Sequence, residues 1–159
     1  LNTALKNAQP QTFPVNKFPS QPGIFGWTKI DTGSALLLEN LPKDLKGRGA
    51  DFGCGYGFLS AALLQKYTLS ALTCIDADKR AVKCCETNLK SYGTTAAFHW
   101  DDLTNPSNPT KKLDFIVMNP PFHEGKKTDI SIGQAFIKHA HQSLKKHGTL
   151  YMVENQQLP

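Results

Sequence analysis

The fold is decided by the stretch Asp51-Phe52-Gly53-Cys54-Gly55-Tyr56-Gly57. A short apolar strand ends at Phe52, and the leucine- and alanine-rich residues 58–67 predict that a helix follows the turn. Glycine permits positive φ and a close approach of the backbone to a ligand, and the following helix offers its N-terminal amides. Because ligands of open parallel sheets sit beyond the carboxyl ends of the strands, the stretch predicts a ligand site at this turn.

On both sides of this turn, short apolar segments alternate with amphipathic ones. Further strands are predicted over residues 71–76, 95–100, 113–118 and 149–154. Helices are predicted over residues 34–41, 58–67, 78–92 and 131–147, the first capped by Asp31 or Thr32 and the last two followed by Gly93 and Gly148. This alternation predicts an α/β, Rossmann-like fold with a doubly wound, mostly parallel sheet and helices on both faces.

The composition sets the class of protein. At 159 residues we expect one domain, and we see neither a run of about 18 apolar residues nor the order of a signal peptide, so we expect a cytoplasmic protein without membrane contact. Residues 1–23 contain four prolines among polar residues, which predicts an extended arm or interdomain linker before a catalytic domain over 24–159. The net charge of +5 favours a polyanionic partner only weakly.

The cysteines give no sign of a metal or disulfide site. No Cys-x-x-Cys pair occurs, and no histidine lies at ligand spacing from any of Cys54, Cys74, Cys84 and Cys85. We therefore expect buried or half-buried free thiols and no bound metal.

Acidic residues at the strand ends indicate which cofactor the glycine turn holds. A dinucleotide site has G-x-G-x-x-G, but here Phe58 stands where its third glycine is expected. Asp51 suits a cationic amino acid group, Asp76 can accept both ribose hydroxyls, and Asp101 or Asp102 can meet an adenine amino group. These residues favour S-adenosylmethionine, with the predicted contacts Asp51, Gly53, Cys54, Gly55, Gly57, Asp76, Asp101 and Asn119.

The stretch Met118-Asn119-Pro120-Pro121-Phe122 ends the fourth strand, next to the first in a doubly wound sheet. An exocyclic amine on a base is a poor nucleophile because its lone pair is delocalised into the ring. Acceptors on its two N–H groups, the Asn119 side chain and the Pro120 backbone carbonyl, would direct that lone pair at a methyl group. Phe122 can stack on the base. A rigid turn that only ends a strand is the alternative.

Together these motifs resemble the class I methyltransferases, and more narrowly the ribosomal RNA small-subunit guanine-N2 methyltransferases. The resemblance covers about residues 21–159, and its specific parts are residues 22–25, 30–38, 51–57 and 119–125. Adenine-N6 and glutamine-N5 methyltransferases share the Asn-Pro-Pro-aromatic core. Phe122-His123-x-Gly125 and Asp31-x-Gly33-Ser34 favour the guanine-N2 branch.

The resemblance implies S-adenosylmethionine as cofactor, ribosomal RNA or the small ribosomal subunit as partner, and catalysis by Asn119, Pro120 and Phe122. The target guanine would be presented out of its stack. His123 shapes the base pocket or fixes the turn, and Lys126 and Lys127 contact phosphate or lie in a solvated loop. Proteins of this family resemble two methyltransferase-like halves, so we expect an N-terminal methyltransferase-like domain in the parent protein. We also expect the C-terminal strand pair to be missing after the fifth strand.

Three alternatives remain open at the level of sequence. The acceptor can instead be adenine N6 or a protein glutamine amide, with the same mechanism. The chain can be a non-catalytic RNA-binding or assembly module that keeps the methyltransferase fold. A nicotinamide enzyme is disfavoured by the glycine spacing.

Overall fold

The computed structural model describes residues 11–12, 18–107, 110–120 and 127–154. Its strands are β1 (Gln11–Thr12), β2 (Pro19–Ser20), β3 (Gly47–Phe52), β4 (Leu69–Asp76), β5 (Ala96–Trp100), β6 (Leu113–Met118) and β7 (Leu144–Met152). Its helices are α2 (Thr32–Asn40), α3 (Phe58–Lys66), α4 (Lys79–Leu89), the 3-10 helix η1 (Lys90–Thr95) and α5 (Lys127–Ser143). In this part of the chain, no helix is long and apolar enough to cross a membrane.

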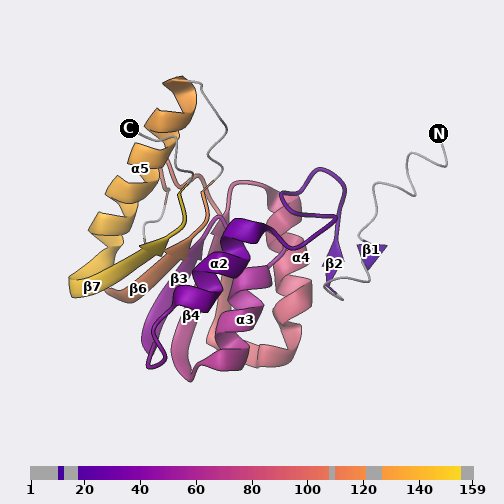
Figure 1. Ribbon diagram of the computed structural model, residues 1–159, viewed down its shortest axis with the longest axis horizontal. Coiled ribbons are helices and arrows are strands. Elements are labelled where there is room, and N and C mark those ends of the chain that lie inside the picture. The colour runs from indigo at the N-terminus through magenta and orange to yellow at the C-terminus, as the bar shows by residue number, and fades with distance from the viewer. Residues whose placement is uncertain (1–10, 13–17, 108–109, 121–126, 155–159) are drawn as a thin grey trace.

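A five-stranded sheet in the order β5-β4-β3-β6-β7 forms the centre of the fold (Figure 1). Each of its four pairings is parallel. The first strand of the predicted alternation, β3, lies between β4 and β6, so the strand that precedes Asn119 neighbours the glycine turn. The predicted doubly wound parallel sheet is confirmed.

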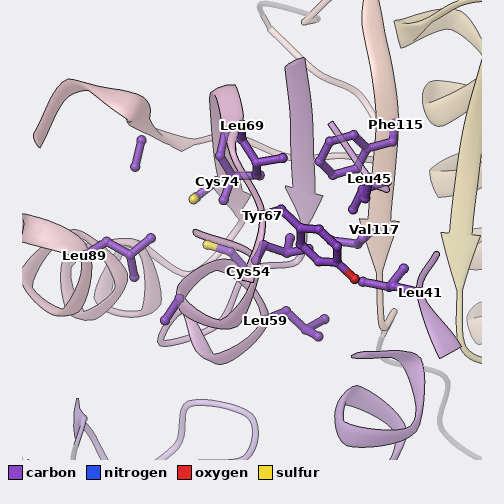
Figure 2. Close-up of a cluster of buried hydrophobic side chains, with 14 of the residues drawn as sticks. Leu41, Leu45, Cys54, Leu59, Tyr67, Leu69, Cys74, Leu89, Phe115 and Val117 are labelled. Carbon is purple, nitrogen blue, oxygen red and sulfur yellow. The ribbon is translucent and has the colours of Figure 1, made fainter. Parts of the chain in front are cut away.

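Helices cover both faces of this sheet, and alternate residues of each strand point to opposite faces. Phe115 and Val117 of β6 pack in a cluster with residues of α2, α3 and α4, part of which Figure 2 shows. Ile116 and Met118 of the same strand pack in a second cluster with Phe136 and Ala140 of α5. Because successive side chains of a buried strand point to opposite faces of the sheet, β6 packs against the helices on both faces.

The largest differences from the predicted boundaries lie in α5 and at the start of β7. The helix predicted over 131–147 covers Lys127–Ser143 instead, because Leu144 already pairs with Leu113 of β6. The register of this pairing shifts between Leu113 and Phe115. On the β7 side of the shift, His147 has positive φ. A Cβ added at Gly148 would lie 2.9 Å from the Leu113 carbonyl oxygen. Gly148 thus permits close strand approach, and the prediction that it follows a helix end is wrong.

The third predicted helix is also shorter than expected. α4 ends at Leu89 and continues as η1, in which Gly93 has φ 62° and ψ −136°. Gly93 is therefore part of the connection to β5 and does not cap α4 directly.

Residues 18–20 pack on the domain. Ser20 is fully buried, and the Asn88 side-chain amide of α4 donates hydrogen bonds to the backbone oxygens of Pro19, at 3.0 Å, and Tyr56, at 2.7 Å. This part of the segment predicted as an arm is thus tied to both α4 and the glycine turn. The rest of residues 1–17, apart from β1, lies outside the described residues.

Candidate active site

The glycine turn has the backbone geometry that its residues allow. Gly53, Gly55 and Gly57 all have positive φ, at 78°, 55° and 95°. The amides of Gly53 and Cys54 donate to the Ile75 carbonyl of β4, which fixes the turn over the neighbouring strand. An added Cβ at Gly55 would meet nothing within 4 Å, so this backbone is open to an approaching ligand.

Gly57 packs closely against α4. An added Cβ there would lie 2.8 Å from Cys85 Sγ and 2.9 Å from Leu89 Cδ1, both on α4. The residue lines neither of the two cavities described below. The absence of a side chain at Gly57 therefore allows α3 to pack closely on α4, and the predicted cofactor contact of Gly57 stays a prediction.

Two neighbouring cavities lie at the carboxyl ends of the strands. The large cavity, of about 360 Å³, is lined by residues that include Asp76, Asp78, Asp102, Leu103, Ile132 and Phe136. The small cavity, of about 40 Å³, is lined by residues that include Asp31, Ser34, Asp51, Cys54, Tyr56 and Leu59. Phe25, Gly53, Gly55 and Asn119 line both cavities.

Asp51 lies at the small cavity and is only 1% exposed. Ser60 Oγ donates to its Oδ2 at 2.6 Å, whereas Oδ1 has no hydrogen-bond partner among the described residues. Burial raises the pKa of Asp51 to about 7, the Ser60 hydrogen bond lowers it, and the charge of Asp76 raises it further. A buried acceptor without a partner at a cavity favours a cationic or donating ligand group.

Asp76 joins the glycine turn to the start of α4. Its Oδ2 accepts from the Gly55 amide at 2.8 Å, and its Oδ1 accepts from the Asp78 amide at 2.8 Å. Burial raises the pKa of Asp76, and these two hydrogen bonds oppose that shift. Since each carboxylate oxygen has a second lone pair, both can still accept from two adjacent hydroxyls of a ligand in the large cavity.

The structure separates the two aspartates that follow β5. The carboxylate of Asp101 accepts from the amides of Asp102 and Ser107 and so holds its own loop. It lines neither cavity, whereas Asp102 lines the large one beside Leu103 and Thr104. Of these two aspartates, Asp102 alone lines the large cavity, and the predicted adenine contact stays a prediction.

Asn119 follows β6 and is held by residues at the start of α2. Its Nδ2 donates to Asp31 Oδ2 at 2.6 Å and to Ser34 Oγ at 2.9 Å. These bonds leave the side-chain oxygen as the group that faces away from α2. Pro120, which follows, is buried.

Several predicted substrate contacts cannot be placed. Phe122, His123 and Lys126 lie outside the described residues, and Lys127 opens α5 with its side chain outside them as well. Their roles stay predictions. The described residues hold no cluster of three or more histidines, cysteines or acids that could bind a metal. All four cysteines are buried and free, as predicted, and Cys54 lines the small cavity.

Sequence reasoning missed several cavity residues. Phe25 lines both cavities although 54% of it is exposed, and Ile132 and Phe136 of α5 line the large one. The latter two belong to the apolar stripe that predicted the helix, and such a stripe does not show which of its residues face a cavity. Phe25 belongs to residues 22–25, one of the stretches that carry the family resemblance, and no other feature of the sequence pointed to it.

Comparisons with known proteins show the family of this chain. The family model described as methyltransferase small domain matches residues 16–159. The "Ribosomal RNA small subunit methyltransferase C" of Shewanella pealeana is 40% identical over 138 residues, which are 86% of this chain and 39% of that relative. The corresponding protein of Shewanella sp. strain MR-4 is also 40% identical over the same shares.

Among solved structures, the T. thermophilus 16S rRNA N2 G1207 methyltransferase RsmC, in complex with AdoMet and guanosine, has a TM-score of 0.75 at 29% identity. The match covers 89% of this chain and 39% of that one, so the chain spans about two fifths of the length of these relatives. This chain belongs to the methyltransferase small domain family.

Proposed function

We propose that this chain is the catalytic domain of an S-adenosylmethionine-dependent enzyme that methylates the exocyclic N2 of a guanine in small-subunit ribosomal RNA. The observation that carries the proposal is the position of Asn119, which lines both cavities. The names of the relatives, ribosomal RNA small subunit methyltransferases, support the same substrate class.

The residues of the two cavities fit S-adenosylmethionine. Asp76 would accept the ribose hydroxyls, and Leu103 and Phe136 would contact the adenine in the large cavity. Asp51 Oδ1, which lacks a partner among the described residues, would accept from the ammonium group in the small cavity. When bound, this cofactor supplies an electrophilic methyl group. The T. thermophilus protein, which was solved with AdoMet, supports this assignment.

The chain's own contribution to the reaction is to orient the amine. Asn119 Oδ1 accepts one N–H of the guanine amine, and the Pro120 backbone carbonyl accepts the other. The nitrogen lone pair is then directed out of the ring plane, where a methyl group can be accepted. The transfer requires no strong base, because the proton leaves after the nitrogen has become a cation.

Transfer to RNA, followed by nucleoside analysis, tests the proposal. Under-methylated small ribosomal subunits are incubated with the full-length protein and labelled S-adenosylmethionine, and the RNA is then digested to nucleosides. N2-methylguanosine is the expected product. N6-methyladenosine or a labelled protein glutamine would favour the alternative acceptors. Cofactor binding without transfer to any of these would favour the non-catalytic module.

The pH dependence of cofactor affinity is a second prediction. The pKa of Asp51 is raised to about 7, so most molecules below that pH hold a neutral carboxyl and must release a proton to bind an ammonium group. Affinity is therefore expected to be about tenfold weaker at pH 6 than at pH 8 and to level off above the pKa. Calorimetry in two buffers of different ionisation enthalpy measures both affinity and proton release.

Asp51→Asn is expected to bind more weakly and to lose this pH dependence. Asp78→Asn is the matched control, because Asp78 also lines a cavity but has a pKa that its hydrogen bond with Arg80 lowers. That variant should keep the wild-type profile. A wild-type affinity that does not change between pH 6 and pH 8 would show that Asp51 does not meet the ammonium group.

We also propose that the parent protein has a further domain and that ribosomal RNA is its partner. The chain covers 39% of the T. thermophilus protein, which is consistent with an N-terminal methyltransferase-like domain in the parent polypeptide. The ribosomal RNA partner follows from the proposed substrate, and the cytoplasmic location stays a prediction.

A further inference from the structure

The carboxylate that caps α2 also contacts the proposed catalytic asparagine. Asp31 precedes the helix in an extended conformation, and its Oδ2 accepts from the Ser34 amide at 2.8 Å, as an N-terminal cap does. The same oxygen accepts from Asn119 Nδ2 at 2.6 Å, although 88 residues separate the two. The cap therefore links the start of α2 to the end of β6.

This contact determines which way the Asn119 amide points. An amide nitrogen has two hydrogens, and Asp31 Oδ2 and Ser34 Oγ accept one each. An ionised carboxylate has no proton to donate, so only the nitrogen can face it. A flipped amide would bring two acceptor oxygens together at that distance. Asn119 is thus held with Oδ1 directed away from α2.

Gly33 leaves the room that this arrangement needs. An added Cβ there would lie 3.1 Å from Asp31 Oδ2, 3.2 Å from Val153 Cγ1 and 3.5 Å from Asn119 Nδ2. Its φ is not positive, so the requirement is for space rather than for an unusual backbone conformation. In Asp31-x-Gly33-Ser34, two acceptors thus flank a residue without a side chain.

We propose that Asp31, Gly33 and Ser34 act as a positioning clamp for Asn119, which keeps Oδ1 aimed at the acceptor amine during transfer. This inference rests on the proposed function. The clamp residues act through Asn119 and touch neither the amine nor the methyl group. Because Asp31 and Ser34 also line the small cavity, direct contact of Asp31 with the cofactor is the competing role that the experiment must separate.

Two substitutions of Asp31 separate the clamp from the helix cap. Asp31→Ser keeps a good capping residue, but its hydroxyl is too short to reach Asn119 as well. Asp31→Asn keeps the length of the side chain and an oxygen that accepts from both Ser34 and Asn119. In the full-length protein at saturating S-adenosylmethionine, Asp31→Ser is expected to lower the single-turnover rate roughly tenfold or more, and Asp31→Asn at most about threefold.

Cofactor affinity decides between the two roles of Asp31. The clamp predicts that both variants bind S-adenosylmethionine with the wild-type Kd, within about threefold. A loss of affinity of about tenfold or more in Asp31→Ser would overturn the proposal, because it would show direct contact with the cofactor. Equal loss of rate in Asp31→Ser and Asp31→Asn would also overturn it.

A double variant shows whether Asp31 acts through Asn119. Adding Asp31→Ser to Asn119→Ala is expected to slow transfer by less than about twofold, because the residue to be positioned is already gone. A full tenfold additional loss would contradict the clamp.

The side-chain amide signal of Asn119 tests the clamp without any substrate. In a ¹⁵N-labelled protein, the Asn119 amide resonances are expected to move on Asp31→Ser and to stay close to the wild-type position on Asp31→Asn. Unchanged resonances in Asp31→Ser would refute the clamp. Because this readout needs no acceptor, a different methylated product would overturn the proposed function and leave the clamp standing.

Discussion

Replacing Asn119 by alanine is expected to lower the rate of methyl transfer by about 10²- to 10³-fold, the usual effect of removing one preorganised group at a reacting centre. The amine would lose the acceptor that directs its lone pair. Cofactor affinity should change by no more than about threefold, because the charged contacts at Asp51 and Asp76 remain. Single-turnover transfer and calorimetry with S-adenosylmethionine measure the two effects separately.

Asn40→Ala is the matched control for this variant. Asn40 is exposed at the end of α2, and its side-chain amide donates to the Leu36 carbonyl within the helix. The same chemical truncation there should leave both rate and affinity unchanged. An Asn119→Ala enzyme that keeps more than about a tenth of the wild-type rate would show that the amide does not orient the acceptor.

The sheet was predictable because its strands are buried on both faces. Apolar runs such as residues 113–118 stand out in a parallel sheet, and β6 has the predicted bounds. The end of α5 was not predictable from local pattern. Residues 144–147, Leu-Lys-Lys-His, favour a helix by propensity, but the pairing of Leu144 with Leu113 makes them part of a strand. Tertiary pairing thus overrides propensity there.

The acids of the site were predictable for a different reason. The carboxyl ends of parallel strands meet at one edge of a sheet, so Asp51 and Asp76 had to lie near the glycine turn. The choice between Asp101 and Asp102 depends on the loop after β5, in which the Ser107 amide binds the first of them. The periodicity of apolar residues does not predict this hydrogen bond, so it cannot tell the two aspartates apart.

From the sequence, Asp31 was predicted as a helix cap and as part of a family motif, but not as a partner of Asn119. Its contact with Asn119 joins segments 88 residues apart, and a single sequence does not show such a contact. The motif Asp31-x-Gly33-Ser34 was therefore visible as part of a resemblance, but its physical role required the structure.

Gly49→Ala is expected to destabilise the protein by about 3 kcal/mol, the upper part of the usual range for overpacking a core. Gly49 lies in β3 at the centre of the sheet, directly opposite Phe115 of β6. An added Cβ would lie 2.1 Å from Phe115 Cζ and 2.4 Å from Cε2, while the ring is 1% exposed and cannot move into solvent. Urea unfolding of the variant and the wild type measures the change in the free energy of unfolding.

Two comparisons identify the clash as the cause. Gly55→Ala places its Cβ in open space, with only the strain of positive φ, and should cost about 1–2 kcal/mol. Phe115→Leu removes the ring atoms that the new methyl would meet, so the double variant Gly49→Ala/Phe115→Leu should be more stable than Gly49→Ala alone. If the changes in the free energy of unfolding caused by the two substitutions are instead strictly additive, the loss of stability in Gly49→Ala comes from the backbone of β3. The absent side chain at Gly49 would then not be what allows the Phe115 ring to pack between β3 and the helices on this face of the sheet.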